Sequence, residues 1–384
     1  MLDKNQNRML AYTERIANVL PIDGADNIEL VMVNSWTLVA KKGEFRKGDQ
    51  CVYFEIDSKV PEKPWSEFLA SRKYKIKTMK LGKFGVISQG LALPVTAFDV
   101  PIPTDDDADC TALLGVTYYD SDDASEKENS ETIEKKANKK LMSVPIIRFF
   151  MKFSATRAII QHAVRVATKL AKPEFSWPAW VIKTDEERCQ NINLGRLKAI
   201  YHGKWIATEK IDGTSSTFTL KIGSLFKRDR YYICSRNRVI HPSASGKYTD
   251  ISKRYEINSV LSRIAKSHGA KSYVTIQGEI YGKGVQKRTY SLQGQDIAAF
   301  NLIVDGKRYG SIEGKKILAE YGIPWVPTLG FGEIDISDDA HTILTMADGM
   351  SVIDGKIREG IVFRSTDGMH SFKAVSNEYL LQKK

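Results

Sequence analysis

A lysine followed two residues later by Asp-Gly stands out among the residues whose types and spacing could support chemistry. Lys210 lies in segment 207–214, which reads ATEKIDGT. This pattern is typical of a nucleophilic lysine that accepts a nucleotide on its side chain. The nucleophile must be a deprotonated amine, whereas an unperturbed lysine has a pKa of about 10.4. Burial, neighbouring cations or metal ions must therefore lower that pKa. Alone, the pattern also fits an exposed turn between two strands.

Further polar residues follow Lys210 in an order that favours one shared site. They lie in or beside short β-branched or aromatic runs, several with the period-two alternation of strands. In segment 273–279, for example, Val274 and Ile276 would point to one face and Glu279 to the other. Strands that each direct one charge toward a common cleft would form a site for a polyanionic ligand.

The charged residues of this set fall into two groups by the ligands that they can hold. Three carboxylates can hold a hard divalent cation, directly or through water: Asp212, Glu279 and Glu359. Three basic side chains can contact phosphate oxygens: Arg188, Arg236 and Lys373. Each of these residues taken singly also fits a solvated charge at the end of a strand, and only the ordered set indicates a site.

The ordered set resembles the lysine nucleotidyltransferases, which include RNA ligases, DNA ligases and mRNA capping enzymes. The resemblance implies that Lys210 is the adenylated lysine and that Glu279 binds the ribose and lies near the metal. It further implies a role for Glu359 with the metal ion. It implies nucleotide-binding roles for six other residues, namely Arg188 and Lys373 at phosphates, Arg236 and Asn237 at the sugar, Phe300 stacked on the base, and Glu209.

The last motif departs from the pattern of many relatives, which carry Lys-x-Lys there. In this chain Ser371 lies two residues before Lys373, and Val375 lies two residues after it. One cationic role is therefore vacant or filled from elsewhere in the chain.

Three further strings look like those of the Deinococcus-type RNA ligases. They are YFEIDS at 53–58, SQGL at 88–91 and KTDEER at 183–188. Those enzymes join an N-terminal OB domain to a C-terminal adenylyltransferase domain and seal RNA ends that carry a 3′-OH and a 5′-phosphate. Residues 1–100 fit an OB module, because they contain short β-rich runs broken by turn signals. Only 11 residues of the 384 follow Lys373, too few for a domain, so we expect the extra module at the N-terminus.

We therefore expect an α+β fold with two folded parts. An OB-like β-barrel that binds nucleic acid would occupy residues 1–103. An acidic linker and a basic helix would follow over 104–172, and an adenylyltransferase domain of antiparallel sheets with flanking helices would occupy 173–384.

The net charge of +11 conceals a strong asymmetry along the chain. Residues 105–134 contain 11 acidic residues and one lysine, so that the remaining 354 residues carry a net charge of +21. Such a basic body suits an RNA partner, for instance a nicked duplex, because neutralised phosphates supply most of the non-specific affinity. A basic surface can also serve solubility alone.

Basic residues gather at two places in the N-terminal module. One group surrounds a turn and consists of Lys41, Lys42, Arg46 and Lys47. The other is interleaved with Tyr74 and Phe84 and consists of Arg72, Lys73, Lys75, Lys77, Lys80 and Lys83. OB folds bind single strands with a basic groove and stacking aromatic rings. The pattern therefore favours contact with an RNA backbone over a merely solvated face.

The region between the two halves has an unusual composition. Residues 119–140 are acidic and serine-rich at first and then basic, and we predict a disordered linker there. Residues 144–172 contain six basic residues and no acidic one, with apolar residues at helical spacing. This basic amphipathic helix could pack on the catalytic domain, cover an RNA groove or lie on a membrane surface. It is too interrupted by charge to form a transmembrane segment.

The four cysteines predict free thiols rather than a zinc site. Cys51, Cys110, Cys189 and Cys234 are far apart, and no Cys-x-x-Cys pair occurs. The polar N-terminus does not resemble a signal peptide. We therefore expect an intracellular protein, either cytoplasmic or nuclear. We also expect a monomer.

Together these features predict an ATP-dependent RNA ligase that uses Mg²⁺ or Mn²⁺. The resemblance implies a covalent lysyl–AMP on Lys210 and then an adenylylated RNA 5′ end. Two alternatives remain open. A capping-type guanylyltransferase would use the same lysine with GTP, and a non-catalytic RNA-binding protein could have kept the scaffold of a ligase.

Overall fold

The computed structural model describes residues 1–4, 6–119, 177–224, 227–236, 238–241 and 244–382. The predicted linker after Tyr119, the predicted basic helix over 144–172 and the predicted sugar contact Asn237 lie outside these residues. The chain divides into two compact units, one of which unites Met1–Thr117 with Trp177–Lys384, while the other is Tyr118–Ser176. All that follows concerns the first unit.

The N-terminal part of this unit is a five-stranded antiparallel sheet that closes on itself. Its strands run in the order β3 (Trp36–Lys41), β2 (Ile28–Val33), β1 (Ala11–Pro21), β4 (Gln50–Phe54) and β8 (Leu91–Pro94). The β3 edge is covered by the segment just before β8, where the Gln89 amide donates to the Thr37 carbonyl at 2.8 Å and the Val39 amide donates to Ser88 Oγ at 3.1 Å. These bonds satisfy the backbone groups that an open sheet would leave exposed.

The interior of this barrel follows from alternation along the strands. On β3, Trp36, Leu38 and Ala40 point inward, while the residues between them are partly exposed. Tyr12 and Tyr53 from the neighbouring strands pack in the same core, with their ring centroids 5.5 Å apart. Period two thus places one apolar face inside the barrel.

Shorter elements complete the N-terminal part. They are β5 (Ser58–Lys59) paired with β9 (Thr117–Tyr118), β6 (Met79–Leu81) paired with β7 (Val86–Ser88), and the 3₁₀ helices η1 (Pro64–Arg72) and η2 (Val95–Ala97). Residues after 103 also belong to this part, because the Thr13 amide donates to the Ala108 carbonyl at 3.0 Å and the Cys110 amide donates to the Ala11 carbonyl at 2.8 Å. The first residues of the acidic segment therefore form backbone hydrogen bonds with β1 of the barrel.

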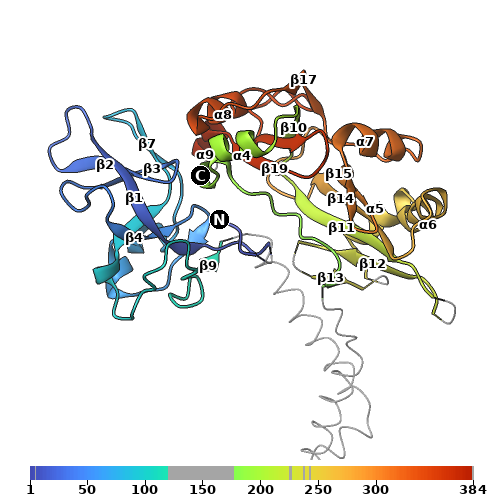
Figure 1. The fold of residues 1–384 in the computed structure, drawn as a ribbon, viewed down its shortest axis with the longest axis horizontal. Helices are drawn as coiled ribbons and strands as arrows, with labels where there is room; N and C mark the ends of the chain where they lie inside the picture. The colour runs from blue at the N-terminus through green and yellow to red at the C-terminus, as the bar shows by residue number, and fades with distance from the viewer. Residues whose placement is uncertain (5, 120–176, 225–226, 237, 242–243, 383–384) are drawn as a thin grey trace, which may run out of the picture. The chain divides into compact units, whose positions relative to one another are not determined.

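The C-terminal part contains a six-stranded antiparallel sheet with three helices. The strands run in the order β13 (Val239–Ile240), β12 (Arg230–Cys234), β11 (Thr214–Lys221), β14 (Tyr273–Gly282), β15 (Gln295–Val304) and β16 (Lys307–Tyr309). The helices are α5 (Lys247–Arg254), α6 (Ile257–Ser267) and α7 (Ser311–Ala319). They bury one face of the sheet, with Leu261 and Ile264 of α6 packed on Val274 and Ile276 of β14 (Figure 1).

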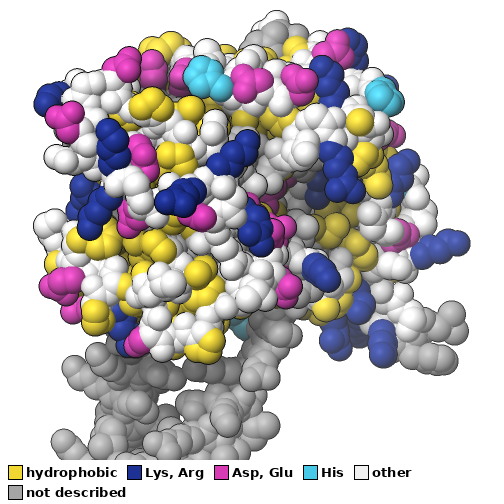
Figure 2. All heavy atoms as spheres, turned by 60° about the vertical axis from the view of Figure 1, so that its left-hand side comes forward, with side chains coloured by type: hydrophobic (Ala, Val, Ile, Leu, Met, Phe, Trp, Pro, Cys, Tyr) yellow, Lys and Arg dark blue, Asp and Glu magenta, His cyan; other side chains and the backbone are white. Residues whose placement is uncertain are grey.

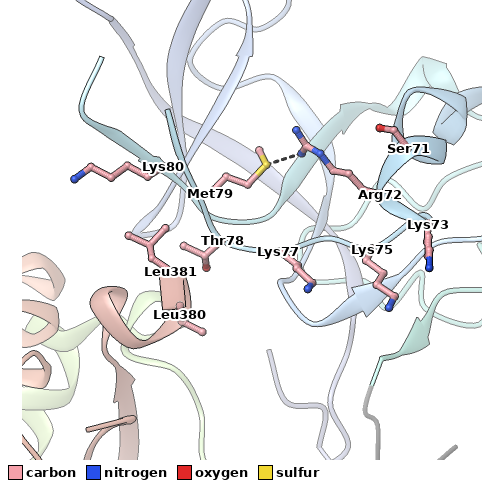
Figure 3. Close-up of a pocket in the computed structure, with 10 residues that line it drawn as sticks. All are labelled: Ser71, Arg72, Lys73, Lys75, Lys77, Thr78, Met79, Lys80, Leu380 and Leu381. Atoms are coloured by element: carbon pink, nitrogen blue, oxygen red, sulfur yellow. Dashed lines mark hydrogen bonds between the residues drawn. The ribbon is translucent and has the colours of Figure 1, made fainter. Parts of the chain in front are cut away.

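A second sheet of four strands supplies the remaining core. Its order is β17 (Thr328–Ile334), β10 (Trp205–Lys210), β18 (Gly360–Ser365) and β19 (Ser371–Val375). It packs with η3 (Cys189–Asn191), α4 (Leu194–Ile200) and α8 (Ala340–Ala347) around buried side chains such as Trp205, Phe363 and Phe372. The short helix α9 (Asn377–Gln382) follows β19, and its Leu380 and Leu381 border a groove (Figure 3).

The predicted α+β class is confirmed, because the strands pair antiparallel in both parts and the helices cover the sheets of the C-terminal part. The predicted polar face of β14 is more enclosed than alternation suggests, since Thr275 and Gln277 are as fully buried as Val274 and Ile276.

All four cysteines are buried free thiols. Among the described helices, none is long and apolar enough to cross a membrane. Figure 2 shows basic and acidic side chains interspersed over one face, with several Lys and Arg side chains around a hollow.

Candidate active site

Lys210 lies where the chain passes from one sheet to the other. It is the last residue of β10, and its register partner on β18 is Gly360. Glu359, which precedes Gly360, therefore lies beside the lysine, and its Oε2 is 2.7 Å from Lys210 Nζ. Residues 211–213 then carry the chain into β11 of the six-stranded sheet.

The glycine of the Lys-x-Asp-Gly pattern allows the two sheets to approach closely. A Cβ at Gly213 would lie 2.4 Å from the Ile280 carbonyl oxygen and 2.7 Å from Glu279 Cγ. Any larger residue would push β14 away. Because only glycine fits, Glu279 reaches the end of β10 and acts electrostatically on Lys210.

The carboxylates around Lys210 hold a proton on the lysine. Burial of the amine lowers its pKa, but Glu359, Glu279 and Asp212 together outweigh burial, so that the pKa of Lys210 lies above its ordinary value. Burial also raises the pKa of Glu279 to about 8, and Lys210 opposes that rise. A cation bound beside these carboxylates would offset their negative charge and lower the pKa of the lysine.

Two tyrosines from distant segments orient Asp212. The Tyr379 hydroxyl on α9 donates to Asp212 Oδ2 at 2.5 Å, and the Asp212 amide donates to the Tyr290 hydroxyl oxygen at 2.6 Å. Sequence reasoning missed both tyrosines, because neither belongs to a recognisable motif and no short-range pattern connects them to Asp212. Only the fold brings them to the lysine.

Lys373 and Arg188 form the cationic side of the site. They meet as neighbours in an isolated parallel bridge, and the Lys373 amide donates to the Glu187 carbonyl at 2.7 Å. Burial lowers the pKa of Lys373 to about 7, helped by Arg8 and Arg188 and opposed by Asp185. Arg188 Nη2 contacts Asp57 Oδ2 at 3.0 Å, whereas its buried Nε and Nη1 have no hydrogen-bond partner in the described residues. Buried donors of this kind favour an anionic ligand.

The altered last motif places a hydroxyl where many relatives have a cation. The Ser371 hydroxyl donates to Glu186, whose other carboxylate oxygen accepts from Arg364 Nη2 at 2.9 Å. The Arg364 guanidinium lies 5.2 Å from the centroid of the Phe300 ring. Val375, the other candidate position, is buried and apolar. Arg364 is therefore a third residue that sequence reasoning missed, and it places a guanidinium close to the altered motif.

Phe300 and Glu209, both predicted to contact the nucleotide, are buried in the C-terminal part. Phe300 packs in an apolar cluster with Ile211 and Tyr290. Glu209 Oε2 accepts from the Val352 amide at 2.9 Å, while its buried Oε1 has no hydrogen-bond partner in the part of the chain that the structure describes. Burial raises the pKa of Glu209. An aromatic ring together with an unsatisfied acceptor suits a base that offers an amino group.

Arg236, predicted at the sugar, is held by a carboxylate. Its Nη2 contacts Asp185 Oδ1 at 2.6 Å. Burial raises the pKa of Asp185, but Arg236 and Lys373 outweigh burial and lower that pKa overall. Asp185 thus lies under the influence of both Arg236 and Lys373, while Asn237, the sequence neighbour of Arg236, is outside the described residues.

The residues predicted as metal ligands suit a cation that also binds a substrate. No group of three or more His, Cys, Asp or Glu side chains in the described segments is arranged to hold a metal ion by itself. Asp212, Glu279 and Glu359 nevertheless all act electrostatically on the same lysine. Mg²⁺ is commonly held by one or two carboxylates together with waters and substrate phosphates. These residues therefore fit a divalent cation that arrives with a phosphate-bearing ligand.

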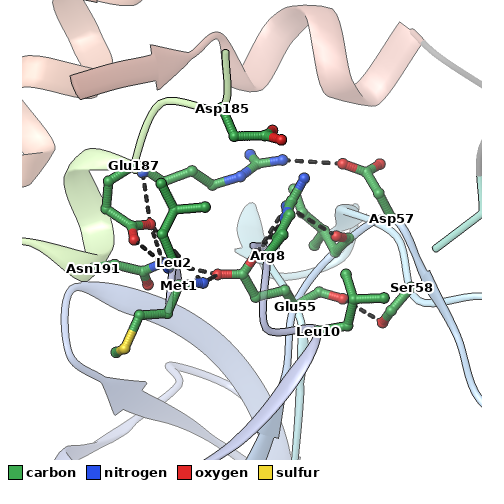
Figure 4. Close-up of polar contacts among 12 residues, drawn as sticks. Met1, Leu2, Arg8, Leu10, Glu55, Asp57, Ser58, Asp185, Glu187 and Asn191 are labelled. Carbon is green, nitrogen blue, oxygen red and sulfur yellow. Dashed lines mark hydrogen bonds and ion pairs between the residues drawn. The ribbon is translucent and has the colours of Figure 1, made fainter. Parts of the chain in front are cut away.

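Two of the strings that resemble one ligase type, those at 53–58 and 183–188, meet in a polar network around Glu55 (Figure 4). Fully buried Glu55 accepts from Arg8 Nε at 2.8 Å and from Asn191 Nδ2 at 2.8 Å. Burial works against ionised Glu55, but Arg8, the N-terminal amine and Arg188 lower its pKa to about 2.

Two more contacts extend this network. Asp57 pairs with Arg188, and Gln89 Nε2 donates to Asn377 Oδ1 at 3.0 Å. The barrel is thus bonded both to the segment that carries Arg188 and to α9, which carries Tyr379.

The comparisons with known proteins agree with this architecture. Residues 10–95 match the model of an OB-fold domain family, and residues 203–376 match the RNA ligase family model. No curated protein matches the chain.

Several solved structures are similar to nearly the whole chain. The Naegleria gruberi RNA ligase with pyrophosphate is 27% identical with a TM-score of 0.74, and the alignment covers 98% of this chain and 99% of that one. A lysine-to-methionine mutant of that ligase with AMP and Mn is also 27% identical, with a TM-score of 0.73 and coverage of 98% and 99%. A glutamate-to-alanine mutant with ATP and Mn is 28% identical, with a TM-score of 0.74 and the same coverage.

Both family models fall on the parts described above, the OB-fold domain on the N-terminal barrel and the ligase model on the two sheets that carry Lys210, Glu279 and Lys373. The chain belongs to the RNA ligases of the Deinococcus type, which carry an OB-fold domain ahead of the ligase domain.

Proposed function

We propose that this protein is an ATP-dependent RNA ligase that joins a 3′-OH to a 5′-phosphate through a lysyl–AMP and an adenylylated RNA 5′ end. The observation that carries the proposal is Lys210, with its Nζ 2.7 Å from Glu359 and under the influence of Glu279 and Asp212. The similar Naegleria ligase structures that contain ATP or AMP with Mn support the choice of nucleotide and metal ion.

The proposed domains follow the sequence pattern, with one adjustment. Residues 1–103 would bind RNA as an OB domain, joined by residues 104–117 that are bonded to the barrel. Residues 173–384 would form the adenylyltransferase domain. The connection between them would include the rest of 104–172.

We assign each site residue a role from the family resemblance and, where the structure describes it, from its surroundings. Glu209 Oε1 would accept from the amino group of adenine, and Phe300 would pack against the base. Glu279 would bind the ribose, with Arg236 and Asn237 as further sugar contacts. Arg188 and Lys373 would contact phosphate oxygens, because buried cations gain most when an anion satisfies them.

Asp212, Glu279 and Glu359 would hold Mg²⁺ or Mn²⁺ together with the phosphates. The cation would neutralise developing charge on the phosphoryl oxygens and offset the carboxylates that now keep Lys210 protonated. Tyr379 and Tyr290 would keep Asp212 oriented throughout.

The reaction would proceed in three displacements at phosphorus. Neutral Lys210 Nζ forms a bond to the α-phosphorus of ATP while the bond to pyrophosphate breaks. An oxygen of the RNA 5′-phosphate then attacks that phosphorus and frees the lysine. Finally the 3′-hydroxyl oxygen attacks the activated 5′-phosphorus, and AMP leaves. Positioning and charge neutralisation are the main demands of such steps.

Labelling with nucleotides tests this proposal directly. The protein is incubated with α-labelled ATP or GTP and Mg²⁺ or Mn²⁺, and the modified peptide is mapped by mass. We expect AMP on Lys210. GMP there would instead identify a capping-type guanylyltransferase, and no label from either nucleotide would favour a non-catalytic RNA-binding protein.

Tyr379→Phe should slow adenylation of Lys210 about tenfold, because losing a hydrogen bond to a charged group costs about 1.5 kcal/mol or more. The affinity for ATP should change less, since Tyr379 acts through Asp212. Single-turnover labelling and equilibrium ATP binding measure the two effects separately.

Tyr255→Phe is a matched control, because the Tyr255 hydroxyl also donates to a carboxylate, Asp296 Oδ1, at 2.5 Å. The two variants should lose similar melting temperature, but only Tyr379→Phe should slow labelling. Equal labelling rates in the two variants would show that the Tyr379 hydroxyl does not contribute to adenylation.

A further inference from the structure

A basic groove lies between the barrel and α9 (Figure 3). Its volume is about 640 Å³. Ten residues line it, namely Ser71, Arg72, Lys73, Lys75, Lys77, Thr78, Met79, Lys80, Leu380 and Leu381. Five of the ten are cationic and none is acidic, so the groove selects for a polyanion.

Helix α9 forms one side of the groove and also contacts the segment that carries Lys210 and Asp212. Leu380 and Leu381 of α9 border the groove, and Leu380 also packs against the apolar core of the barrel. Tyr379, the preceding residue, donates to Asp212 Oδ2 at 2.5 Å. The same short helix therefore contacts both the groove and the Lys-x-Asp-Gly turn, so that a ligand in the groove lies against the helix that orients Asp212.

The lining also indicates which part of a nucleic acid the groove contacts. Among the described residues that line it, none is aromatic, and Tyr74 and Phe84, which the sequence suggested as stacking rings, are not part of this lining. Lys83 lies over the Phe84 ring at 5.2 Å from its centroid. Without stacking platforms, the groove offers contacts to phosphates and apolar contact to sugars, and neither reads base sequence.

We propose that the groove formed by residues 71–80 and α9 binds the phosphodiester backbone of the RNA strand that is sealed. This inference rests on the proposed ligase function and adds the place where the strand is held. Binding there is independent of sequence and sensitive to salt, because each neutralised phosphate releases condensed counterions.

The test is a triple variant, Lys73→Ala, Lys77→Ala and Lys80→Ala, which removes three exposed cations of the groove. Binding of fluorescein-labelled single-stranded RNA is measured over a series of salt concentrations. The triple variant should bind roughly tenfold more weakly at low salt, and the slope of log affinity against log salt should fall by about 2.

Lys266→Ala, Lys315→Ala and Lys316→Ala together form the matched control, because they remove the same charge from exposed positions on α6 and α7. This control should bind RNA with nearly the wild-type affinity and slope. Melting temperatures show that both triple variants are folded. Thiouridine-containing RNA should also crosslink to the peptide that contains residues 71–80 in the wild-type protein.

Equal loss of RNA binding in the two triple variants would refute the proposal that RNA binds in the groove, because net charge alone would then explain the effect. Wild-type affinity in the groove variant, or groove-dependent binding to anionic phospholipid vesicles with RNA binding unchanged, would also overturn it. Labelling of the wild-type protein with ATP separates the two proposals. If the protein is labelled by ATP but its RNA affinity does not depend on the groove residues, only this inference is refuted. If ATP does not label the protein, the proposed function is refuted.

Discussion

Lys210→Ala should abolish the covalent AMP label and with it all sealing that starts from ATP. No other amine can replace Nζ, because the proposed bond to phosphorus forms on that atom at the end of β10, beside Glu359. Lys210→Arg should be equally inactive, since a guanidinium stays protonated in proteins. Labelling with α-labelled ATP, followed by sealing of RNA that already carries a 5′-adenylate, checks both steps. The second reaction does not need the lysine as nucleophile and should retain some activity.

Lys204→Ala provides the control for this substitution. Lys204 lies just before β10, and its Nζ contacts Asp335 Oδ2 at 2.7 Å, the same distance as the Lys210–Glu359 pair, but on the exposed surface. Such exposed pairs contribute little to stability. Full labelling of Lys204→Ala with none in Lys210→Ala would assign the nucleophile, whereas a label that survives in Lys210→Ala would refute the assignment.

Lys373 should make the binding of pyrophosphate depend on pH. In the ligand-free protein, burial together with Arg8 and Arg188 lowers the pKa of Lys373 to about 7, so that the amine is largely neutral above that pH. A bound phosphate favours the ammonium form and raises the pKa. Binding must therefore take up a proton above about pH 7, and affinity should fall as pH rises from there toward the pKa of the complex.

Two substitutions separate charge from shape at this position. Lys373→Ala should weaken pyrophosphate binding roughly 30-fold at pH 6, because a charge-assisted hydrogen bond contributes about 2 kcal/mol. Lys373→Arg should remain charged and lose most of the pH dependence. Calorimetry in buffers of different ionisation enthalpy counts the protons taken up. An unchanged pH profile in Lys373→Arg would assign the dependence to another group.

The strands that carry the predicted site residues were predictable because their motifs follow one another in order along the chain. Lys210 ends β10, Glu279 lies on β14 and Glu359 precedes β18, and the pairing of Lys210 with Gly360 brings Glu359 beside the lysine. Sequence could not show the state of Lys210. A lowered pKa was expected from the chemistry, yet the carboxylates raise it, and that balance depends on distances between two sheets.

The partners of these residues were not predictable, because they come from far along the chain. Tyr379 reaches Asp212 across 167 positions, and Arg364 reaches Glu186 across 178. No local period or motif encodes such pairs. The surroundings of Ser371 were equally hidden from sequence reasoning, because its hydroxyl donates to Glu186, a carboxylate that also accepts from Arg364.

The network around Glu55 has a consequence for how such enzymes can diversify. Glu55 is 0% exposed, and part of its hydrogen bonding comes from Asn191, outside the barrel. A chimaera with a foreign barrel would keep the ion pairs that Glu55 makes within its own barrel but lose this amide donor, at a cost of about 1.5–3 kcal/mol for a hydrogen bond to a charged group. Exchange of the two halves during evolution is therefore favoured when residues 55 and 191 change together.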